Sequence, residues 1–193
     1  IVDGDRIIAM CTLDLKERGR LRNNTVAITV MTNLGFHKAM EANDINVVTT
    51  AVGDRHIIEA MRANDYVIGG EQSGHIIFKD FATTGDGTIG ALMVLALMKR
   101  TGKTVKELAQ CMDVFPQKLT NLPAKEKPPI ESIAAIQDVI KECEAALKDT
   151  GRCMLRYSGT ENKLRILLEA ESAEDVDTWT KKFVAVVQQE LGS

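Results

Sequence analysis

The chain has 193 residues, of which 45% are hydrophobic and 26% are charged, so it can bury the core of one large or two small domains. Its formal net charge of -3 argues against nucleic-acid binding, because nucleic-acid-binding proteins are usually basic. Any affinity for phosphate must come from local groups of cations. The longest apolar run, Ile89 to Met98, is too short to span a bilayer, so we expect no membrane partner.

The cysteines and histidines point to a cytoplasmic protein without zinc. The four cysteines are far apart and form no C-x-x-C pair, and we recognise no signal peptide, so we expect reduced thiols. The three histidines show no ligand spacing to any cysteine. The chain does not begin with Met, and its first six residues are typical of a loop cut in its middle, so we expect a fragment.

Apolar runs and helical periods alternate along the first part of the chain. Two β-branched runs, Arg6–Cys11 and Thr25–Met31, predict strands on either side of a charged loop over residues 14–24. The next segments predict a helix, a buried strand, a helix and a strand: Leu34–Ala42, Ile45–Ala51, His56–Ala63 and Tyr66–Gly70. This alternation indicates an α/β layer with a mainly parallel sheet.

The first domain, expected over residues 9–113, ends with a strand, an apolar helix and a short final segment. Ile76–Phe78 predicts the strand, and Thr88–Lys99 predicts a helix too apolar on all sides to face water. The segment Val105–Met112 completes the domain. All four prolines lie between positions 116 and 129, which predicts a stiff linker over residues 114–129.

Residues 130–193 predict a second, smaller domain. A helix that ends before Gly151 carries five apolar residues on one face: Ile133, Ile136, Ile140, Cys143 and Leu147. Two strands, Arg152–Tyr157 and Leu164–Ala170, flank a polar turn, and a final helix begins after Ser172 as its N-cap. The predicted fold class is therefore α/β, a mixed α/β sheet domain followed by a smaller α+β domain.

The polar turn has the groups that a phosphate monoester requires. Arg156 and Arg165 flank Ser158-Gly159-Thr160, which combines hydroxyl donors with a glycine that lets backbone N–H groups approach a ligand. Arginine forks match the oxygens of a phosphate. A polar hairpin turn without a ligand is the alternative, because short motifs also occur by chance.

Two further loops follow predicted strands, at the carboxyl ends where open α/β sheets bind ligands. In Gly70-Glu71-Gln72-Ser73-Gly74-His75, glycines expose a carboxylate, a hydroxyl and an imidazole, groups that suit the hydroxyls of a sugar. A polar loop in which His75 has only a structural role is the alternative. The second loop, Thr50-Ala51-Val52-Gly53-Asp54-Arg55, opens a helix, so Asp54 could equally be its N-cap and Arg55 solvated.

Two short acidic segments complete the set of motifs. Asp3-Gly4-Asp5-Arg6 has carboxylates at alternate positions, which can bind Mg²⁺ through oxygen ligands, although two loop carboxylates are more often hydrated. Thr83-Thr84-Gly85-Asp86-Gly87 leads into the apolar helix, and we expect Asp86 to cap that helix.

Taken in order, the five motifs resemble those of the α-D-phosphohexomutase superfamily. They read D-G-D-R, T-A-V-G-D-R, G-E-Q-S-G-H, T-T-G-D-G and R-Y-S-G-T-E-N-K-L-R, and the form G-E-Q-S-G-H is similar to the phosphoglucosamine mutase branch. The resemblance covers the whole chain but only the C-terminal half of such an enzyme. It implies that residues 1–8 end a metal-loop domain, that the third and fourth domains follow, and that the missing partners are N-terminal domains of the same protein.

The resemblance also implies a reaction and the residues that perform it. A phosphoserine would convert glucosamine 6-phosphate to a 1,6-bisphosphate and then to glucosamine 1-phosphate, for amino-sugar synthesis. The catalytic residues implied are His75, Arg55 and Arg6. The substrate-binding residues implied are Glu71, Ser73, Gly53, Asp54, Arg156, Ser158, Gly159, Thr160 and Arg165. Asp3 and Asp5 are implied as ligands of Mg²⁺.

Departures from the family pattern limit what we expect of this chain. The first aspartate of the metal loop would fall at Ile1, so the Mg²⁺ site is expected to be incomplete. Asn162 stands where many members have proline. The serine nucleophile is absent, so we expect the fragment to be inactive by itself. A phosphomannomutase/phosphoglucomutase fragment and a non-catalytic phosphosugar-binding module are the alternatives.

Overall fold

The computed structural model describes residues 1–192 and divides the chain into two compact units, Ile1–Val114 and Phe115–Ser193. Each unit has its own sheet and its own apolar cluster, so each is described by itself. Over the described residues, no helix has both the length and the apolar composition needed to cross a bilayer.

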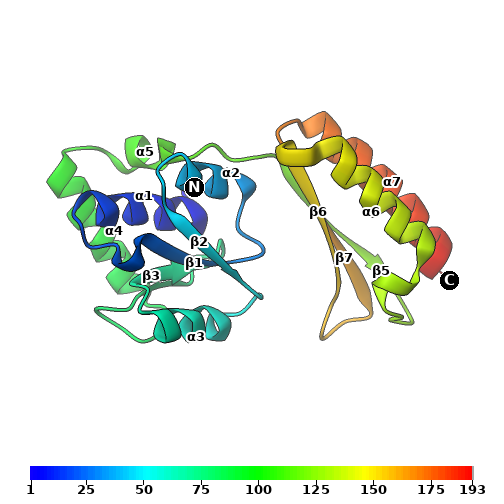
Figure 1. Ribbon diagram of the computed structural model, residues 1–193, viewed down its shortest axis with the longest axis horizontal. Coiled ribbons are helices and arrows are strands. Elements are labelled where there is room, and N and C mark those ends of the chain that lie inside the picture. Colours follow the sequence, from blue (N-terminus) through cyan, green and yellow to red (C-terminus); the bar gives the residue numbers. More distant parts are fainter. Residues whose placement is uncertain (193) are drawn as a thin grey trace. The chain divides into compact units, whose positions relative to one another are not determined.

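The first unit is built on a four-stranded sheet that is parallel except at one edge (Figure 1). β1 (Thr25–Thr29) lies between β2 (Asn46–Thr50) and β3 (Ile68–Gly70) and pairs in parallel with both. β4 (Ile76–Phe78) pairs antiparallel with β3. The predicted mainly parallel sheet is therefore confirmed. Because β1, β2 and β3 run in the same direction, the loops that follow them all begin at the same end of the strands.

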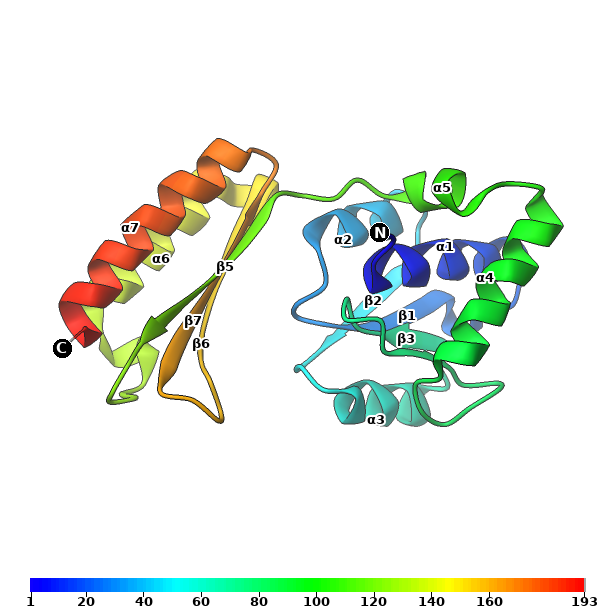
Figure 2. The same ribbon diagram turned by 180° about the vertical axis from the view of Figure 1, so that it is seen from behind.

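Helices cover both faces of this sheet. They are α1 (Gly4–Glu17), α2 (Leu34–Glu41), α3 (Asp54–Asn64), α4 (Gly87–Thr101) and α5 (Val105–Leu108). Figure 2 shows α1 and α2 on one face and α3 on the other. The side chains of β1 alternate accordingly: Val26 and Ile28 join the cluster formed with α1 and α2, whereas Ala27 packs with Ile57 and Met61 of α3. All residues of β1 are buried as a result.

Arg6–Cys11 is helical, although its apolar run predicts a strand. Asp3 is the N-cap of α1, and its Oδ1 accepts a hydrogen bond from the backbone N–H of Arg6 at 3.0 Å. Ile8 and Leu15, which α1 buries in the core, lie about two helical turns apart. The strand prediction is wrong because a short apolar run fits a strand and a buried helix equally well.

Two elements of this unit are more exposed than the sequence predicts. β2 is a strand, as predicted, but it lies at the edge of the sheet and its residues are exposed or half-buried. α4 is a helix, as predicted, but only Gly90 and Leu97 are buried in it, and Leu92 and Leu95 are 59% and 58% exposed. The predictions of burial are wrong for both elements, since burial depends on what packs against an element.

The second unit is a three-stranded antiparallel sheet with helices on one face (Figure 2). β7 (Lys163–Ala170) lies between β5 (Gln117–Pro123) and β6 (Gly151–Tyr157). α6 (Ala134–Leu147) and α7 (Ala173–Leu191) bury the apolar cluster of this unit, which includes Phe183, Leu164 and Ile166. A mixed α/β sheet unit is thus followed by a smaller α+β unit, and the predicted fold class is confirmed.

Part of the predicted linker, residues 114–129, is a strand. β5 pairs with β7 along its whole length, and the N–H of Ala124 donates to the carbonyl of Asn162 at 3.0 Å. Pro123 is tolerated because it ends an edge strand, where a missing N–H costs little. Pro116 and Pro123 therefore mark the two ends of β5, and Phe115 already belongs to the second unit.

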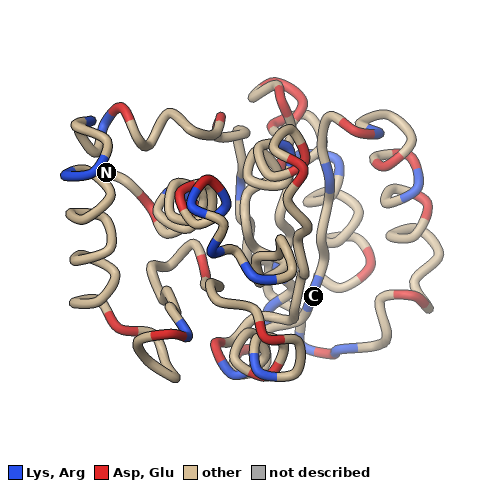
Figure 3. Tube along the Cα trace, turned by 60° about the vertical axis from the view of Figure 1, so that its left-hand side comes forward, with Lys and Arg blue, Asp and Glu red and all other residues tan. Residues whose placement is uncertain are grey.

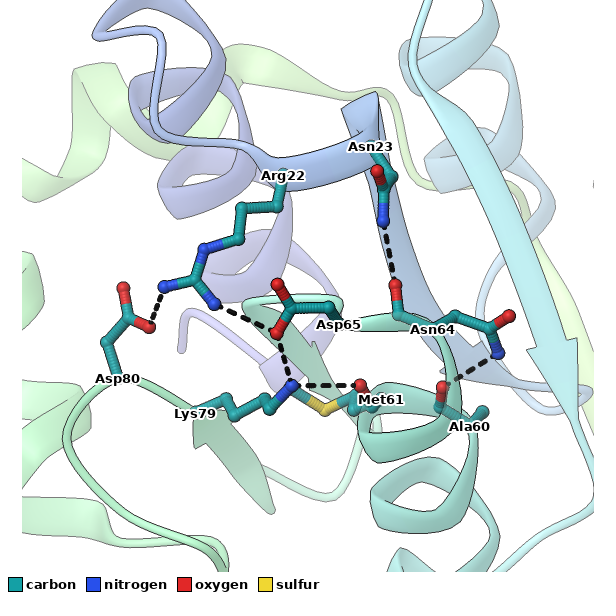
Figure 4. A network of polar contacts seen from close by, with 8 residues as sticks. All are labelled: Arg22, Asn23, Ala60, Met61, Asn64, Asp65, Lys79 and Asp80. Atoms are coloured by element: carbon teal, nitrogen blue, oxygen red, sulfur yellow. Dashed lines mark hydrogen bonds and ion pairs between the residues drawn. The ribbon is translucent and has the colours of Figure 1, made fainter.

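A network of ion pairs ties three segments of the first unit together at the amino ends of its parallel strands (Figure 4). Arg22, just before β1, contacts Asp65 at 3.0 Å and also contacts Asp80. Lys79 Nζ contacts Asp65 at 2.6 Å and donates to the carbonyl oxygen of Met61 at 3.3 Å. The network joins the start of β1 to the end of α3 and the end of β4.

We predict that Lys79→Met lowers the free energy of unfolding slightly at neutral pH and by less in acid. The hydrogen bond from Lys79 is the largest of the causes that lower the pKa of Asp65. A carboxylate with a lowered pKa stabilises the fold above its unfolded pKa of about 3.9, and this contribution is lost as the pH falls through the folded value.

Urea unfolding at about pH 7 and about pH 3 measures the effect. Lys141→Met, which removes an exposed lysine of the second unit, controls for the change in net charge. An equal loss from Lys79→Met at both pH values would contradict the prediction.

Candidate functional site

Three polar loops of the first unit meet at the edge where its parallel strands end. Residues 51–53 follow β2, and residues 71–75 join β3 to β4. The loop after β4 returns to the same edge, where the N–H of Asp86 donates to the carbonyl of Ile76 at 3.3 Å. The edge opposite the Arg22 network therefore gathers the candidate sugar-binding residues.

Glu71 joins two of these loops directly. The backbone N–H of Gly53 donates to Oε1 of Glu71 at 3.1 Å, so the segment after β2 is held against the segment after β3. Gly53 has a φ of 121°, a conformation that side chains rarely allow. Oε2 of Glu71 takes part in no hydrogen bond within residues 1–192, which leaves it for a ligand.

His75 and Asp54 form a second link across the same loops. Nε2 of His75 lies 3.5 Å from Oδ2 of Asp54, and both side chains are 45% exposed. The turn that carries His75 is closed by the N–H of Glu71 donating to the carbonyl of His75 at 3.0 Å. Ser73 is exposed at the tip of this turn. Glu71, Ser73 and His75 therefore present a carboxylate, a hydroxyl and an imidazole together.

Arg55 does not join this cluster. Its Nε donates to Oε1 of Glu59 at 2.8 Å, one turn along α3, and its side chain is 82% exposed. The hydrogen bond that Arg55 donates to Glu59 is the largest cause that raises the pKa of Arg55. Arg55 lies beside Asp54 in the sequence, but it is held on the outer surface of α3 in this structure.

The segment Asp3-Gly4-Asp5-Arg6 packs against the same sugar loop. The N–H of Gly4 donates to the carbonyl of Gln72 at 3.0 Å. A Cβ at Gly4 would lie 2.2 Å from the carbonyl oxygen of Glu71 and 2.8 Å from the nitrogen of Gly74, so only glycine fits here. A fourth motif is thereby placed at the site.

The carboxylates of this segment already have partners in the fold. Asp3 caps α1, and Asp5 is fully buried and accepts a hydrogen bond from the N–H of Asn33 at 2.9 Å. The part of the chain that the structure describes contains no group of three or more His, Cys, Asp or Glu residues suited to a metal ion. Asp3 and Asp5 therefore offer at most two of the six oxygen ligands that an octahedral Mg²⁺ takes.

Arg6 lies beside them on the first turn of α1. Its Nε is buried and has no hydrogen-bond partner within residues 1–192. A buried donor without a partner costs free energy, which a ligand or a further segment of protein would recover.

In the second unit, two arginines lie side by side on the face of the sheet away from the helices. Leu164 and Ile166 of β7 point into the apolar cluster, so Arg165 between them points to the opposite face. In the strand register, Arg165 lies opposite Arg156 of β6 on one side and Asn121 of β5 on the other. Neighbouring guanidiniums repel each other unless an anion lies between them, so this row suits a phosphate.

The hairpin turn between β6 and β7 places a hydroxyl beside these arginines. Ser158 is buried, and its Oγ accepts hydrogen bonds from the N–H of Glu161 at 3.2 Å and from Nη2 of Arg165 at 3.4 Å. Gly159 and Thr160 are exposed at the tip of the turn. The residues of the predicted phosphate loop are thus brought together.

Glu161 competes for the same cation. Its Oε2 lies 3.4 Å from Nη2 of Arg165, and its Oε1 lies 2.6 Å from Nζ of Lys163. The hydrogen bond from Lys163 is the largest of the causes that lower the pKa of Glu161, so this carboxyl stays ionised. A bound phosphate must therefore share Arg165 with Glu161 or displace it.

The structure adds two polar residues that sequence reasoning missed. Nζ of Lys127 donates to the carbonyl of Ser158 at 2.8 Å, which places a third cation at the turn. Asn121 lies in the same row as the two arginines. Both lie in the predicted linker, and no local signal reveals them because they reach the turn only through the pairing of β5 with β7.

Cations and anions are mixed along the part of the chain that the structure describes. Figure 3 shows Lys and Arg interspersed with Asp and Glu along both units, in keeping with the net charge of -3. The cations at the hairpin turn therefore act locally, as the composition requires.

Family models match both units of the chain. Residues 3–115 match the model described as phosphoglucomutase/phosphomannomutase, alpha/beta/alpha domain III. Residues 119–186 match the model described as phosphoglucomutase/phosphomannomutase, C-terminal domain.

Curated relatives match over the whole chain. It is 47% identical over 192 residues to the phosphoglucosamine mutase of Bacillus pumilus, covering 100% of this chain and 43% of that protein. It is 46% identical over 193 residues to the phosphoglucosamine mutase of Chlamydia trachomatis, covering 100% of this chain and 42% of that protein. The chain therefore spans less than half the length of these relatives.

Solved structures share the fold at lower identity. The N-acetylphosphoglucosamine mutase of Aspergillus fumigatus superposes with a TM-score of 0.81 and 21% identity, over 97% of this chain and 43% of that one. Its complex with GlcNAc-6P and magnesium has a TM-score of 0.78 and 20% identity, over 97% and 44%. A phosphoglucomutase/phosphomannomutase family protein of Burkholderia thailandensis has a TM-score of 0.71 and 15% identity, over 98% and 42%.

We predict that Gly4→Ala destabilises the first unit by about 1–3 kcal/mol, because the added methyl group collides with backbone atoms that cannot move aside. Gly90→Ala in the interior of α4 is the matched control. It meets no atom within 4 Å and is expected to stabilise that helix by about 0.5–1 kcal/mol. Urea unfolding of each variant measures both effects. Equal free energies of unfolding for the two variants would contradict the prediction.

Proposed function

Because the chain belongs to the phosphoglucomutase/phosphomannomutase family, we propose that it is the C-terminal part of a phosphoglucosamine mutase. The complete protein interconverts glucosamine 6-phosphate and glucosamine 1-phosphate through a phosphoserine and a 1,6-bisphosphate. The observation that carries the proposal is the meeting of the Gly53, Glu71 and His75 loops at one edge of the first sheet. The identity of 46–47% to phosphoglucosamine mutases over the whole chain supports it.

The second unit binds the phosphate ester that is not being transferred. Arg156 and Arg165 supply guanidinium donors on one face of the sheet, and Ser158 supplies a hydroxyl beside them. Gly159 and Thr160 at the tip of the turn offer backbone and hydroxyl donors. Hydrogen bonds to a charged partner contribute about 1.5–3 kcal/mol each, enough for this group to anchor the substrate.

The first unit binds the sugar ring. Oε2 of Glu71 accepts hydrogen bonds from ring hydroxyls, and the hydroxyl of Ser73 adds a second contact. Gly53 acts through its N–H, which fixes the orientation of the Glu71 carboxylate. A substrate that binds in two orientations requires contacts of this kind, because ring hydroxyls can be recognised in either pose.

His75 handles the proton at the reacting oxygen. Asp54 lies 3.5 Å from its Nε2 and orients the imidazole. Arg6 and Arg55 supply positive charge for the phosphoryl group during transfer. Arg55 must leave Glu59 to do so, because the two are ion-paired at 2.8 Å in this structure.

Binding energy at the remote phosphate orients the reacting end of the substrate. Such positioning can lower a barrier by up to about 7–11 kcal/mol. Separate groups for the phosphate and for the sugar ring allow binding energy at one end of the substrate to lower the barrier at the other end.

Magnesium remains part of the proposal for the complete protein. The neighbour from Aspergillus fumigatus binds magnesium together with GlcNAc-6P. Asp3 and Asp5 contribute two carboxylates at most, so the remaining ligands are water, phosphate oxygens of the substrate or residues outside this chain. We propose that the complete enzyme acts in the cytoplasm and supplies glucosamine 1-phosphate for the synthesis of amino sugars and peptidoglycan precursors.

We predict that the complete protein converts glucosamine 6-phosphate when a hexose 1,6-bisphosphate activator is present, and that residues 1–193 alone do not. The chain lacks the serine that carries the phosphoryl group in this mechanism. A coupled assay of glucosamine 1-phosphate measures both, with glucose 6-phosphate and mannose 6-phosphate as competitors. Turnover by the chain alone would refute the proposal that it is an incomplete enzyme, and a preference for neutral sugars would favour a phosphoglucomutase/phosphomannomutase.

We predict that Arg156→Ala and Arg165→Ala in the complete protein each raise the KM for glucosamine 6-phosphate by about 10–100-fold, because each removes charge-assisted hydrogen bonds to phosphate. Lys127→Met is expected to raise it by about 3–10-fold, because Lys127 holds the turn through the carbonyl of Ser158. Arg20→Ala removes an exposed arginine far from these loops in the sequence and is the control. An unchanged KM in the Arg156/Arg165 double variant would exclude the phosphate site.

A further inference from the structure

Gly85 lies directly against the imidazole of His75. A Cβ built at Gly85 would lie 2.1 Å from Cδ2 of His75 and 2.5 Å from Nε2. Carbon atoms that are not bonded to each other do not approach so closely. The backbone of Gly85 is therefore in contact with the edge of the ring that carries Nε2.

The reason for glycine at this position is space and not backbone conformation. Gly53 and Gly74 have φ angles of 121° and 97°, in the region that side chains rarely adopt, and Gly85 is not in that group. Gly87, two residues later, meets no atom within 4 Å of an added Cβ. Of these two neighbouring glycines, only Gly85 meets His75.

Asp54 holds the same edge of the ring from another element. Its Oδ2 lies 3.5 Å from Nε2 of His75, and Asp54 is the first residue of α3. The imidazole is thus confined between the carboxylate of α3 and the backbone of the loop that precedes α4. A side chain at residue 85 would occupy the space in which Nε2 now faces Asp54.

The position of Gly85 is itself fixed by its neighbour. The N–H of Asp86 donates to the carbonyl of Ile76 in β4 at 3.3 Å. Oδ1 of Asp86 accepts hydrogen bonds from the N–H groups of Thr88 and Ile89 at 2.8 and 2.9 Å, which caps α4. Gly85 therefore lies next to a residue tied to both the sheet and a helix, and it cannot easily move away from the ring.

We propose that Gly85 is a positioning residue: by lacking a side chain, it leaves the space that keeps Nε2 of His75 directed at Asp54 and so holds the imidazole in one orientation. The inference has two parts, and only the second, that His75 takes part in turnover, rests on the proposed function. The placement of the ring is a property of this chain and can be measured without activity.

The first test is made by NMR on residues 1–193. An NOE between the Hα protons of Gly85 and Hδ2 of His75 is expected in the unaltered chain. In Gly85→Ala, the imidazole resonances of His75 are expected to shift, whereas Gly87→Ala is expected to leave them in place. Absence of the NOE, or unchanged His75 resonances in a folded Gly85→Ala, would overturn the proposal.

A double-mutant cycle keeps the test decisive if Gly85→Ala is unstable. The variants are Gly85→Ala, His75→Ala and the two together, compared by urea unfolding. The cost of Gly85→Ala is expected to disappear when His75 is alanine, because the collision is with the imidazole. Equal costs in both backgrounds would mean that residue 85 does not act through His75.

The last test measures turnover in the complete protein. Gly85→Ala is expected to lower kcat by about 10–100-fold with less than about a threefold change in KM, because a catalytic group displaced by about 1 Å loses efficiency while binding is kept. Gly87→Ala is expected to retain activity. If the ring moves in Gly85→Ala but kcat does not change, the positioning of His75 stands and its proposed role in proton transfer fails.

Discussion

The parallel pairing of β1 with both β2 and β3 is the constraint on which the first unit depends. Because the three strands run in one direction, the loops that follow β2 and β3 leave the sheet at one edge, where Gly53 and Glu71 come within hydrogen-bond distance. The opposite edge has a different role, since Arg22 and Lys79 hold its loops together by ion pairs. The ion pairs thus hold the loops at one end of the strands, and the loops that carry Gly53, Glu71 and His75 lie at the other end.

In the second unit, strand alternation and register perform the corresponding task. The helices require apolar side chains on one face of the sheet, so the alternate residues of β7, Arg165 among them, point to the other face. The register then aligns Arg165 with Arg156 and Asn121. The repulsion between the two guanidiniums is balanced in part by Glu161, which lies 3.4 Å from Arg165. The remaining positive charge of the two arginines favours the binding of an anion, although the sheet folds without one.

The sequence predicts elements well where local signals agree and fails where distant partners decide. Turn residues and period place α2, α3 and β4 correctly, and motif order identifies the family that the comparisons confirm. The strand at β5 and the contact of Lys127 with Ser158 were not predictable, since both depend on pairing with β7. Among the candidate site residues, the link between Gly53 and Glu71 follows from strand direction, whereas the pairing of Arg55 with Glu59 does not.

Three glycines of the motifs are explained by three separate physical reasons, and only one of these reasons is visible in a sequence. Gly53 adopts a positive φ, a role that its place before a helix suggests. Gly4 is required because backbone atoms of Glu71 lie too close for any side chain. Gly85 is required because an imidazole occupies the space beside it. The geometry of the site therefore depends on the missing side chains as much as on its acids, hydroxyls and imidazole. Each of these three glycines allows a neighbouring polar group to take its position.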